Sequence, residues 1–259
     1  MKHAAPTPGK YREAARYALF FSSNWIAVLT VTYAVLLIPF TAVFFTDSVL
    51  SVLRMYTPIP EAVDMLLYIV WFLLLSPLSV GLLYYYTDLF RAAHGDGRSH
   101  VPPAVIFSPY ASLLSVVRAW GQVFMTLLLC ALIPLSLLPL YMACTSILQA
   151  HAVMPAILLL LGGIVLFLCV LYLNARLTPV LFLSSVHPEL SFGDAVRRTW
   201  KTARTTAVTG VLLQLGLLAA GVCSLVLTAG IVFFIYVLPV AVFTYIGYCH
   251  DLSRRCDLL

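Results

Sequence analysis

Two short segments of the sequence, 94–100 and 249–257, carry side chains of the kinds that bind metal ions. These side chains are His94, Asp96, His100, Cys249, His250, Asp251, Cys256 and Asp257. Imidazole, thiolate and carboxylate are the usual zinc ligands, but they must converge on one point, and three adjacent residues on a helix point in different directions. Neither segment has the spacing of a known site. The sequence therefore predicts no metal and no cofactor.

Catalysis would need a nucleophile beside a base, or an acid paired with a base. The apolar stretches hold only isolated polar side chains, chiefly Asn174 and Gln214. We expect these to form hydrogen bonds between helices, worth on the order of 1 kcal/mol each. A lipid-modifying enzyme would need paired acid, base or metal residues, which the sequence does not offer; loss of activity on changing His187 or Asp194 would favour it. The sequence therefore predicts that the protein is not an enzyme.

The composition identifies the elements that carry these side chains. Of 259 residues, 62% are hydrophobic and 10% are charged. The mean hydropathy is +1.01. A soluble domain carries about 25% charged residues. The chain is therefore predicted to be an all-α, polytopic integral membrane helix bundle.

The number of transmembrane helices follows from four stretches that lack Asp, Glu, Lys and Arg: 17–46, 65–87, 119–175 and 205–250. A helix rises about 1.5 Å per residue and the hydrocarbon core is about 30 Å thick, so about 20 residues make one crossing. The first two stretches hold one crossing each, and the last two hold a hairpin of two. We predict one transmembrane domain over residues 1–259, with six spans at about 25–45, 65–87, 120–141, 155–177, 206–228 and 231–249.

The basic residues predict the orientation of these spans. Those of the two tails and of the loops after the second and fourth spans all fall on one side: Lys2, Lys10, Arg12, Arg16, Arg91, Arg98, Arg118, Arg197, Arg198, Lys201, Arg204, Arg254 and Arg255. The other side has Arg54 alone. The positive-inside rule then places both ends of the chain in the cytoplasm. Arg176, which ends the fourth span, is expected to extend its side chain to the cytoplasmic interface.

A short amphipathic helix is expected before the fifth span, beginning at Ser191. Its apolar face would hold Phe192, Ala195, Val196, Trp200 and Ala203. Such a helix lies in the headgroup plane, with its basic face against anionic lipid. The residues predicted to contact lipid headgroups are Arg197, Arg198, Trp200, Lys201 and Arg204.

Similar segments precede the first and third spans and end at Trp25 and Trp120. They predict three repeats of an amphipathic helix plus a hairpin, over residues 10–89, 104–186 and 191–250. The alternative is that any chain entering the membrane three times from the cytoplasm acquires interfacial Trp and Arg residues. Within the fifth span, Gly216, Ala220 and Ser224 form a stripe of small residues, which predicts close packing against another helix.

Two regions of the chain resemble known families. They are Ser76-Pro-Leu-Ser-Val-Gly81 followed by Tyr84 to Arg91, and Arg176-Leu-Thr-Pro179 through Pro188, Ser191-Phe-Gly-Asp194-Ala and Trp200-Lys201. The chain is similar here to the uncharacterised six-span bacterial membrane families of the YciC and YesL kind, known as domains of unknown function. The resemblance implies a bacterial inner-membrane location and supplies no catalytic residues.

Together these patterns predict a non-enzymatic membrane protein that contacts anionic lipid headgroups at the cytoplasmic face or assists a membrane complex. Its partners would be lipids and a second membrane protein, and not nucleic acid, because the basic residues lie between apolar spans. The alternative is an uncoupled transporter or permease component for a small amphipathic solute. It would use a cavity among helices broken at prolines, for which the candidates are Pro77, Pro134, Pro139, Pro179 and Pro239.

Overall fold

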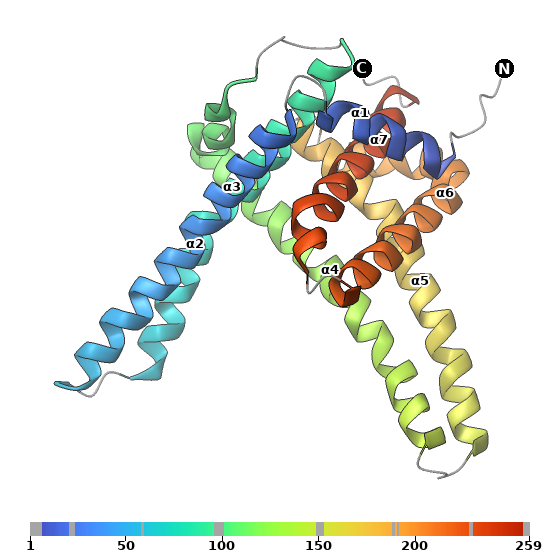
Figure 1. Ribbon diagram of the computed structural model, residues 1–259, viewed down its shortest axis with the longest axis horizontal. Helices are drawn as coiled ribbons and strands as arrows, with labels where there is room; N and C mark the ends of the chain where they lie inside the picture. Colours follow the sequence, from blue (N-terminus) through green and yellow to red (C-terminus); the bar gives the residue numbers. More distant parts are fainter. Residues whose placement is uncertain are drawn as a thin grey trace. The chain divides into compact units, whose positions relative to one another are not determined.

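The computed structural model describes residues 7–20, 24–57, 60–95, 101–148, 153–187, 190, 192–227 and 230–255. Its elements in chain order are α1 (Pro8–Phe20), α2 (Asn24–Arg54), α3 (Glu61–Ala93), the 3-10 helix η2 (Pro103–Ala111), α4 (Leu113–Leu148), α5 (Val153–Val186), α6 (Phe192–Leu227), the π-helical η3 (Phe233–Val237) and α7 (Leu238–Arg255) (Figure 1). No strand occurs within these ranges. The predicted all-α class is confirmed.

Six of the described helices are long and apolar enough to cross a membrane: Asn24–Arg54, Glu61–Ala93, Leu113–Ile147, Met154–Val186, Thr206–Leu227 and Phe233–Arg255. The chain is therefore a multi-pass membrane protein. The first of these helices has 31 residues, whereas about 20 suffice to cross the hydrocarbon. The longer helices therefore extend beyond the apolar layer at one end or both.

The chain divides into two compact units. Unit 1 comprises Met1–Glu13 and Phe124–Leu259, and unit 2 comprises Ala14–Val123. The boundaries between the units fall inside α1 and α4. The sequence-based division into one domain built from three repeats stays a prediction.

In unit 2, α2 and α3 form a hairpin (Figure 1). Polar side chains join the two helices. Trp71 Nε1 donates a hydrogen bond to the Thr46 hydroxyl at 2.8 Å. Nearer the loop, the Tyr68 hydroxyl donates to Asp47, and Arg54 pairs with Asp64. The large apolar side chains of α2 and of the first half of α3 are mostly exposed, Phe44 at 66% and Met65 at 67% among them, whereas those of the second half of α3 are largely buried. Lipid is the environment that suits such a surface.

Pro77 interrupts the hydrogen-bond ladder of α3, because proline lacks the N–H that would bond to the carbonyl of Leu73. Trp120 Nε1 donates to this Leu73 oxygen at 2.6 Å. Beside it, the Tyr110 hydroxyl donates to the Leu74 oxygen at 2.5 Å. Trp120 therefore has a structural role in unit 2, because it supplies the hydrogen-bond donor that Pro77 lacks.

Replacing Trp120 by phenylalanine should lower the thermal stability of the protein in detergent. The change leaves the Leu73 carbonyl without a donor, at a cost of about 1.5 kcal/mol. Trp71→Phe is the matched control, because the Thr46 hydroxyl keeps its bond to the Ala42 oxygen. The free energy of unfolding of this variant should fall by well under about 1 kcal/mol.

A Pro77→Ala background provides a second check on this assignment. The new backbone N–H can bond to the Leu73 oxygen, so the effect of Trp120→Phe should shrink. Equal losses from Trp120→Phe and Trp71→Phe, or an unchanged loss in the Pro77→Ala background, would contradict the capping role.

The backbone of η2 lies directly against α3 at Gly81. A Cβ atom placed on Gly81 would lie 2.6 Å from the Ile106 carbonyl carbon and 2.9 Å from its Cα, and closer still to the carbonyl oxygen. Both Gly81 and Ile106 are buried. Glycine is therefore required here by the close approach of two backbones.

In unit 1, α4 and α5 form a second hairpin. Asn174 Nδ2 of α5 donates to the Leu129 oxygen of α4 at 3.1 Å. Gln214 Nε2 of α6 donates to the Tyr245 hydroxyl of α7 at 2.9 Å. The prediction that Asn174 and Gln214 bond between helices is confirmed.

A left-handed glycine separates the last two spans. Gly230 has a φ of 85° and lies between the predicted spans 206–228 and 231–249. η3 follows, and Pro239 comes two residues after η3 ends. A π-helical turn just before a proline widens the helix where the hydrogen-bond ladder is already interrupted.

Candidate functional site

Arg176 is a buried cation in unit 1, with only 6% of the residue exposed. Its Cζ lies 3.7 Å from the ring centroid of Trp200 and 5.6 Å from that of Tyr172. Nη1 donates to the Tyr172 hydroxyl at 3.1 Å, and Nη2 donates to the Trp200 carbonyl oxygen at 2.5 Å. We call Tyr172, Arg176 and Trp200 the Arg176 site. It joins α5 to the first part of α6.

The guanidinium stays charged in this environment. Stacking on a desolvated aromatic face contributes about 2 kcal/mol, against a desolvation cost of several kcal/mol for a buried ion. A ring of α6 covers Arg176, and the expectation that its side chain extends to the membrane interface stays a prediction. The sequence had no local signal for this contact, because Trp200 lies 24 residues away.

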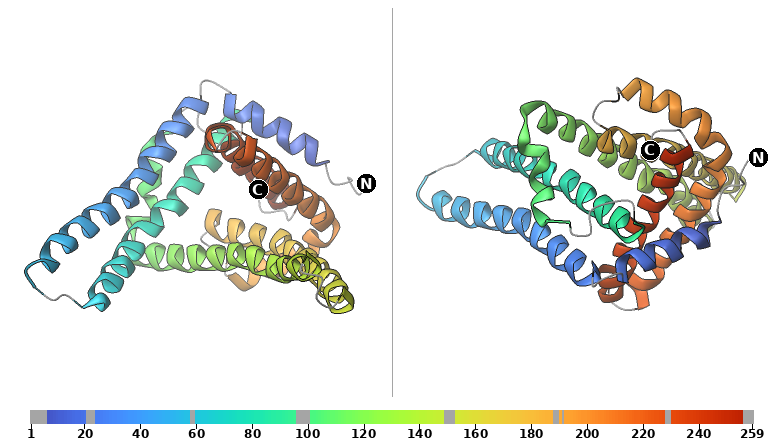
Figure 2. Two further views of the ribbon diagram at one scale, coloured as in Figure 1. Left: turned by 60° about the horizontal axis from the view of Figure 1, so that its bottom comes forward. Right: turned by 90° about the horizontal axis from the view of Figure 1, so that it is seen from above.

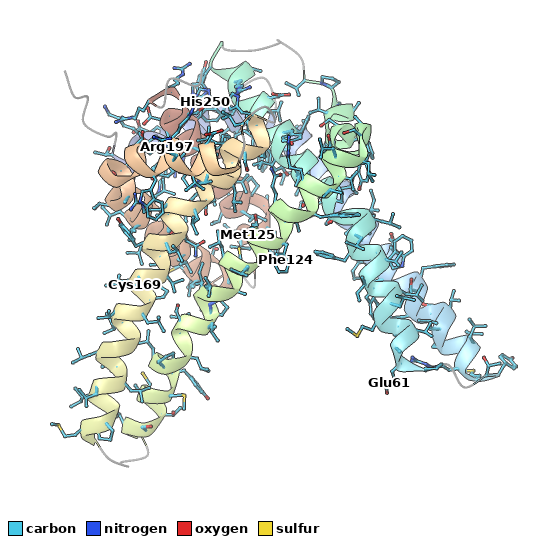
Figure 3. The ribbon with its side chains drawn as sticks, turned by 180° about the vertical axis from the view of Figure 1, so that it is seen from behind. Glu61, Phe124, Met125, Cys169, Arg197 and His250 are labelled. Carbon is cyan, nitrogen blue, oxygen red and sulfur yellow. The ribbon has the colours of Figure 1, made fainter. Side chains whose placement is uncertain are left out.

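The first part of α6 carries the residues predicted to contact lipid headgroups. Arg197 and Arg198 are exposed, and Trp200 is 45% exposed. Ala195 and Thr199, on the other side of the helix, are fully buried. Lys201 and Arg204 lie on the same helix, but their side chains are outside the described part of the structure. Figure 3 shows Arg197 on the first turns of α6.

The expected short amphipathic helix is not a separate element. It is the first part of α6, which continues through the apolar span to Leu227. The ribbon of α6 changes direction between its first part and its span (Figure 2). The Trp200 carbonyl, which accepts the bond from Arg176, belongs to the first part. Side-chain bonds to a helical carbonyl are common where a helix bends.

The three small residues of the fifth span lie in different surroundings. A Cβ on Gly216 would meet the guanidinium of Arg12, whose Cζ would be 3.5 Å away. Ala220 is exposed, and Ser224 is buried and donates to the Gly221 oxygen at 2.9 Å. Gly221, which the spacing did not single out, lies against the ring of Phe233. Close contact with α1 is therefore seen at Gly216.

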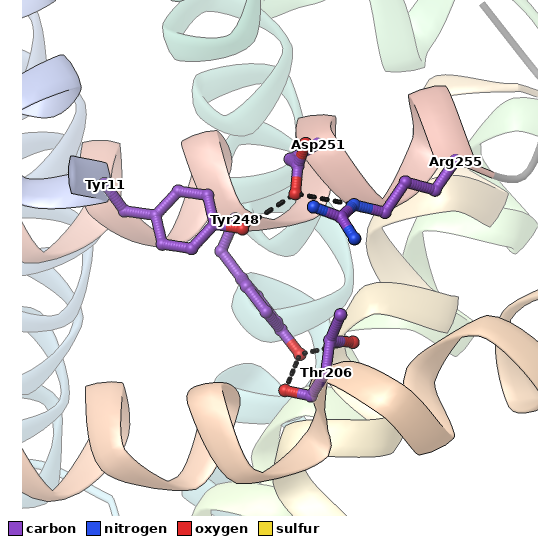
Figure 4. A network of polar contacts seen from close by, with 5 residues as sticks. All are labelled: Tyr11, Thr206, Tyr248, Asp251 and Arg255. Carbon is purple, nitrogen blue, oxygen red and sulfur yellow. Dashed lines mark hydrogen bonds and ion pairs between the residues drawn. The ribbon is translucent and has the colours of Figure 1, made fainter. Parts of the chain in front are cut away.

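A second polar cluster in unit 1 joins α1, α6 and α7 (Figure 4). The Tyr11 hydroxyl donates to Asp251 Oδ2 at 2.7 Å, and Arg255 Nε donates to the same oxygen at 3.0 Å. The ring of Tyr11 meets that of Tyr248 edge-on, with 5.7 Å between centroids. The Tyr248 hydroxyl donates to the Thr206 oxygen at 3.3 Å.

Burial raises the pKa of the Tyr11 hydroxyl above its ordinary value, and the hydrogen bond to Asp251 adds to the shift. The phenol is therefore a neutral donor at every pH below about 10. This cluster acts as a set of fixed hydrogen bonds that hold the start of α1 against the end of α7.

Of the two segments with metal-binding residue types, 249–257 contributes Asp251 to the cluster just described, and 94–100 begins at the end of α3. His94 stacks on Phe90 at 4.3 Å, and its Nδ1 lies 2.9 Å from the Phe90 oxygen. Cys249 and His250 are buried. Within the ranges that the structure describes, no three His, Cys, Asp or Glu side chains are grouped as a metal site. Asp96, His100, Cys256 and Asp257 lie outside those ranges.

Six apolar helices and two buried polar clusters define a multi-pass helical membrane protein. No protein-family model, no curated protein and no solved structure matches this chain. The resemblance to the six-span bacterial families thus stays a prediction.

Proposed function

We propose that this chain is a non-enzymatic protein of the bacterial inner membrane that binds anionic phospholipid headgroups at the cytoplasmic face. The observation that carries the proposal is the pair of exposed arginines, Arg197 and Arg198, on the first turns of a helix whose buried side holds Ala195 and Thr199. The apolar span of the same helix begins at Thr206, so these cations precede the membrane by less than three turns.

Electrostatics supports anionic lipid as the ligand. Each Lys or Arg near an anionic membrane surface contributes about 1 kcal/mol of attraction, which falls off within a Debye length. Arg197, Arg198, Lys201 and Arg204 fall within eight residues of one helix. The half-exposed Trp200 among them suits the boundary between headgroups and acyl chains. The positive-inside rule supports a cytoplasmic location for this segment and for both ends of the chain.

The proposed role of headgroup binding is to organise lipid or to assist a second membrane protein. The resemblance to the YciC and YesL kind of family supports the bacterial inner membrane as its location. A permease component remains the alternative function, and nucleic acid is not proposed as a partner, since the basic residues adjoin apolar spans.

The test compares the native chain with the triple variant Arg197→Gln/Arg198→Gln/Lys201→Gln. Both are reconstituted in vesicles of phosphatidylglycerol and phosphatidylcholine, extracted gently, and analysed for retained lipid by native mass spectrometry. We expect the variant to lose at least about fivefold of its preference for phosphatidylglycerol, since three contributions of about 1 kcal/mol are removed.

Arg54→Gln serves as the control at the loop between α2 and α3, and it should keep the native preference. Raising the salt to about 0.5 M should reduce the preference of the native chain, because exposed charges are screened. An unchanged preference in the triple variant, or an equal loss in Arg54→Gln, would rule out lipid contact by this part of α6.

A further inference from the structure

The charge of Arg176 is not balanced by any carboxylate among the described residues. Its two hydrogen bonds go to neutral oxygens, those of the Tyr172 hydroxyl and the Trp200 backbone. The ion pairs that the structure records in the described chain involve Arg54 and Arg255 instead. A buried cation without a counter-charge is disfavoured unless an anion joins it.

The donors of the guanidinium are also incompletely used. The group has five N–H donors, and Arg176 directs one bond from Nη1 and one from Nη2 to protein oxygens. Its Nε atom is fully buried and has no hydrogen-bond partner. The remaining donors on Nε and Nη2 lie along one edge of the planar group, the arrangement that binds two oxygens of a phosphate or carboxylate at once.

The ring of Trp200 covers the face of the guanidinium. The tryptophan is 45% exposed, whereas Arg176, directly beneath its ring at 3.7 Å, is 6% exposed. The guanidinium is therefore one ring thickness below a surface. Rotation of the indole side chain would uncover Arg176 without any movement of the helix backbone.

We propose that Arg176 binds the phosphate group of an anionic phospholipid, and that the ring of Trp200 covers the site when it is empty. This inference rests on the proposed function, because it names the buried residue that holds a headgroup attracted by the exposed arginines of α6. Phosphate is favoured over carboxylate because the site adjoins the predicted headgroup layer, where phosphate is the abundant oxyanion. Free phosphate has the same binding chemistry, and the experiment separates the two sources.

The experiment measures thermal unfolding of the full-length protein in a neutral detergent at about 0.5 M salt, where exposed charges contribute little. Dihexanoyl-phosphatidylglycerol, dihexanoyl-phosphatidylcholine and inorganic phosphate are titrated separately. For the native chain we expect phosphatidylglycerol to raise the midpoint by several degrees and to saturate, as binding to the folded state requires. Arg54→Gln should give the same shift as the native chain.

Three variants test the named residues. Arg176→Gln should lose the shift, and Arg176→Lys should keep less than half of it, because an ammonium group cannot form the two-point contact. Since a change at Arg176 can impair folding by itself, Trp200→Ala is the independent variant. It removes the indole ring that covers the site. The phosphatidylglycerol concentration at half-saturation should therefore fall by a factor of about three or more.

A shift with phosphatidylglycerol alone identifies a lipid headgroup as the ligand, and a shift with inorganic phosphate as well identifies the phosphate group itself. Absence of a saturable shift, a full shift in Arg176→Gln, or weaker binding in Trp200→Ala would overturn the proposal. These outcomes are independent of the test of the proposed function. The preference for phosphatidylglycerol can depend on Arg197, Arg198 and Lys201 whether or not Arg176 binds a phosphate.

Discussion

Replacing Gly81 by alanine is expected to disrupt the packing of α3 against η2 and to destabilise unit 2. The added methyl group would occupy the position of the Ile106 carbonyl, and its distances to backbone atoms leave no flexible side chain to move aside. Overpacking of this kind costs about 3 kcal/mol. The better helix propensity of alanine returns at most about 1 kcal/mol, so we expect a net loss of about 2 kcal/mol or more.

The measurement is the unfolding midpoint in detergent, together with the rate of proteolysis in the segment from Val101 to Ser112, which η2 occupies. Gly121→Ala is the matched control. Gly121 lies in the same unit and in a helix, and a Cβ there would meet nothing within 4 Å. That variant should be neutral or slightly more stable.

This contact also changes how a transport experiment should be designed. A bulky residue at Gly81 would be the natural way to block a path among proline-broken helices, but loss of flux in such a variant would follow from misfolding. Normal stability of Gly81→Ala, or an equal loss in Gly121→Ala, would show that α3 and η2 do not approach as closely as described here.

Removing the Asp251 carboxylate is expected to loosen the cluster that joins α1 to α7. Asp251→Ala takes away the acceptor of two hydrogen bonds, from Tyr11 at 2.7 Å and from Arg255 at 3.0 Å. Hydrogen bonds to a charged group contribute about 1.5 kcal/mol or more each. We expect a loss of about 3 kcal/mol in the free energy of unfolding of unit 1.

A double-mutant cycle with Tyr11→Phe isolates the bond between the two residues. The coupling between Tyr11→Phe and Asp251→Ala should be about 1 kcal/mol or more. Glu13→Ala, which removes an exposed carboxylate two residues further along α1, should change stability by less than about 0.5 kcal/mol.

Cys249 offers a direct readout of this region. Its thiol is 1% exposed and lies two residues before Asp251. In a chain whose other five cysteines are replaced by serine, Asp251→Ala should speed thiol labelling at Cys249, and Glu13→Ala should not. Additive effects in the cycle, together with unchanged labelling, would mean that the cluster does not hold α1 in place.

The helical class and the six apolar helices could be predicted from the sequence because they depend on one local property. A charge-free stretch such as 65–87 is too long and too apolar for water, and within hydrocarbon its backbone groups must bond inside the segment. The bonds of Asn174 and Gln214 between helices were predictable for a related reason, since a polar amide in an apolar span needs a partner from elsewhere.

The finer arrangement depends on residues that are distant in the sequence. Trp120 was assigned to the membrane interface by its type, whereas it bonds to Leu73, a carbonyl that became available only because of Pro77. Arg176 was expected at the interface because charged residues at span ends usually lie there, but its burial beneath the ring of Trp200 could not be predicted. In each case the decisive partner comes from another helix, and no periodicity or composition reports it.

The requirement for a particular glycine likewise depends on residues that are distant in the sequence. Spacing selected Gly216 with Ala220 and Ser224, but the closest backbone approach in the described chain is at Gly81, which stands outside any stripe of small residues. A glycine required by a neighbouring backbone has no signature in its own helix. Only the position of Ile106 in η2 explains it.

The bond from Trp120 to Leu73 has a consequence for biosynthesis. The indole is encoded 47 residues after the carbonyl it serves, and a ribosome adds about 5 to 20 residues per second. For roughly 2 to 9 seconds, the nascent α3 is present while its partner is still being made. During that interval water, lipid headgroups or the insertion machinery must supply a hydrogen-bond donor to the Leu73 carbonyl. The hairpin of α2 and α3 therefore reaches its final structure only after α4 has been made.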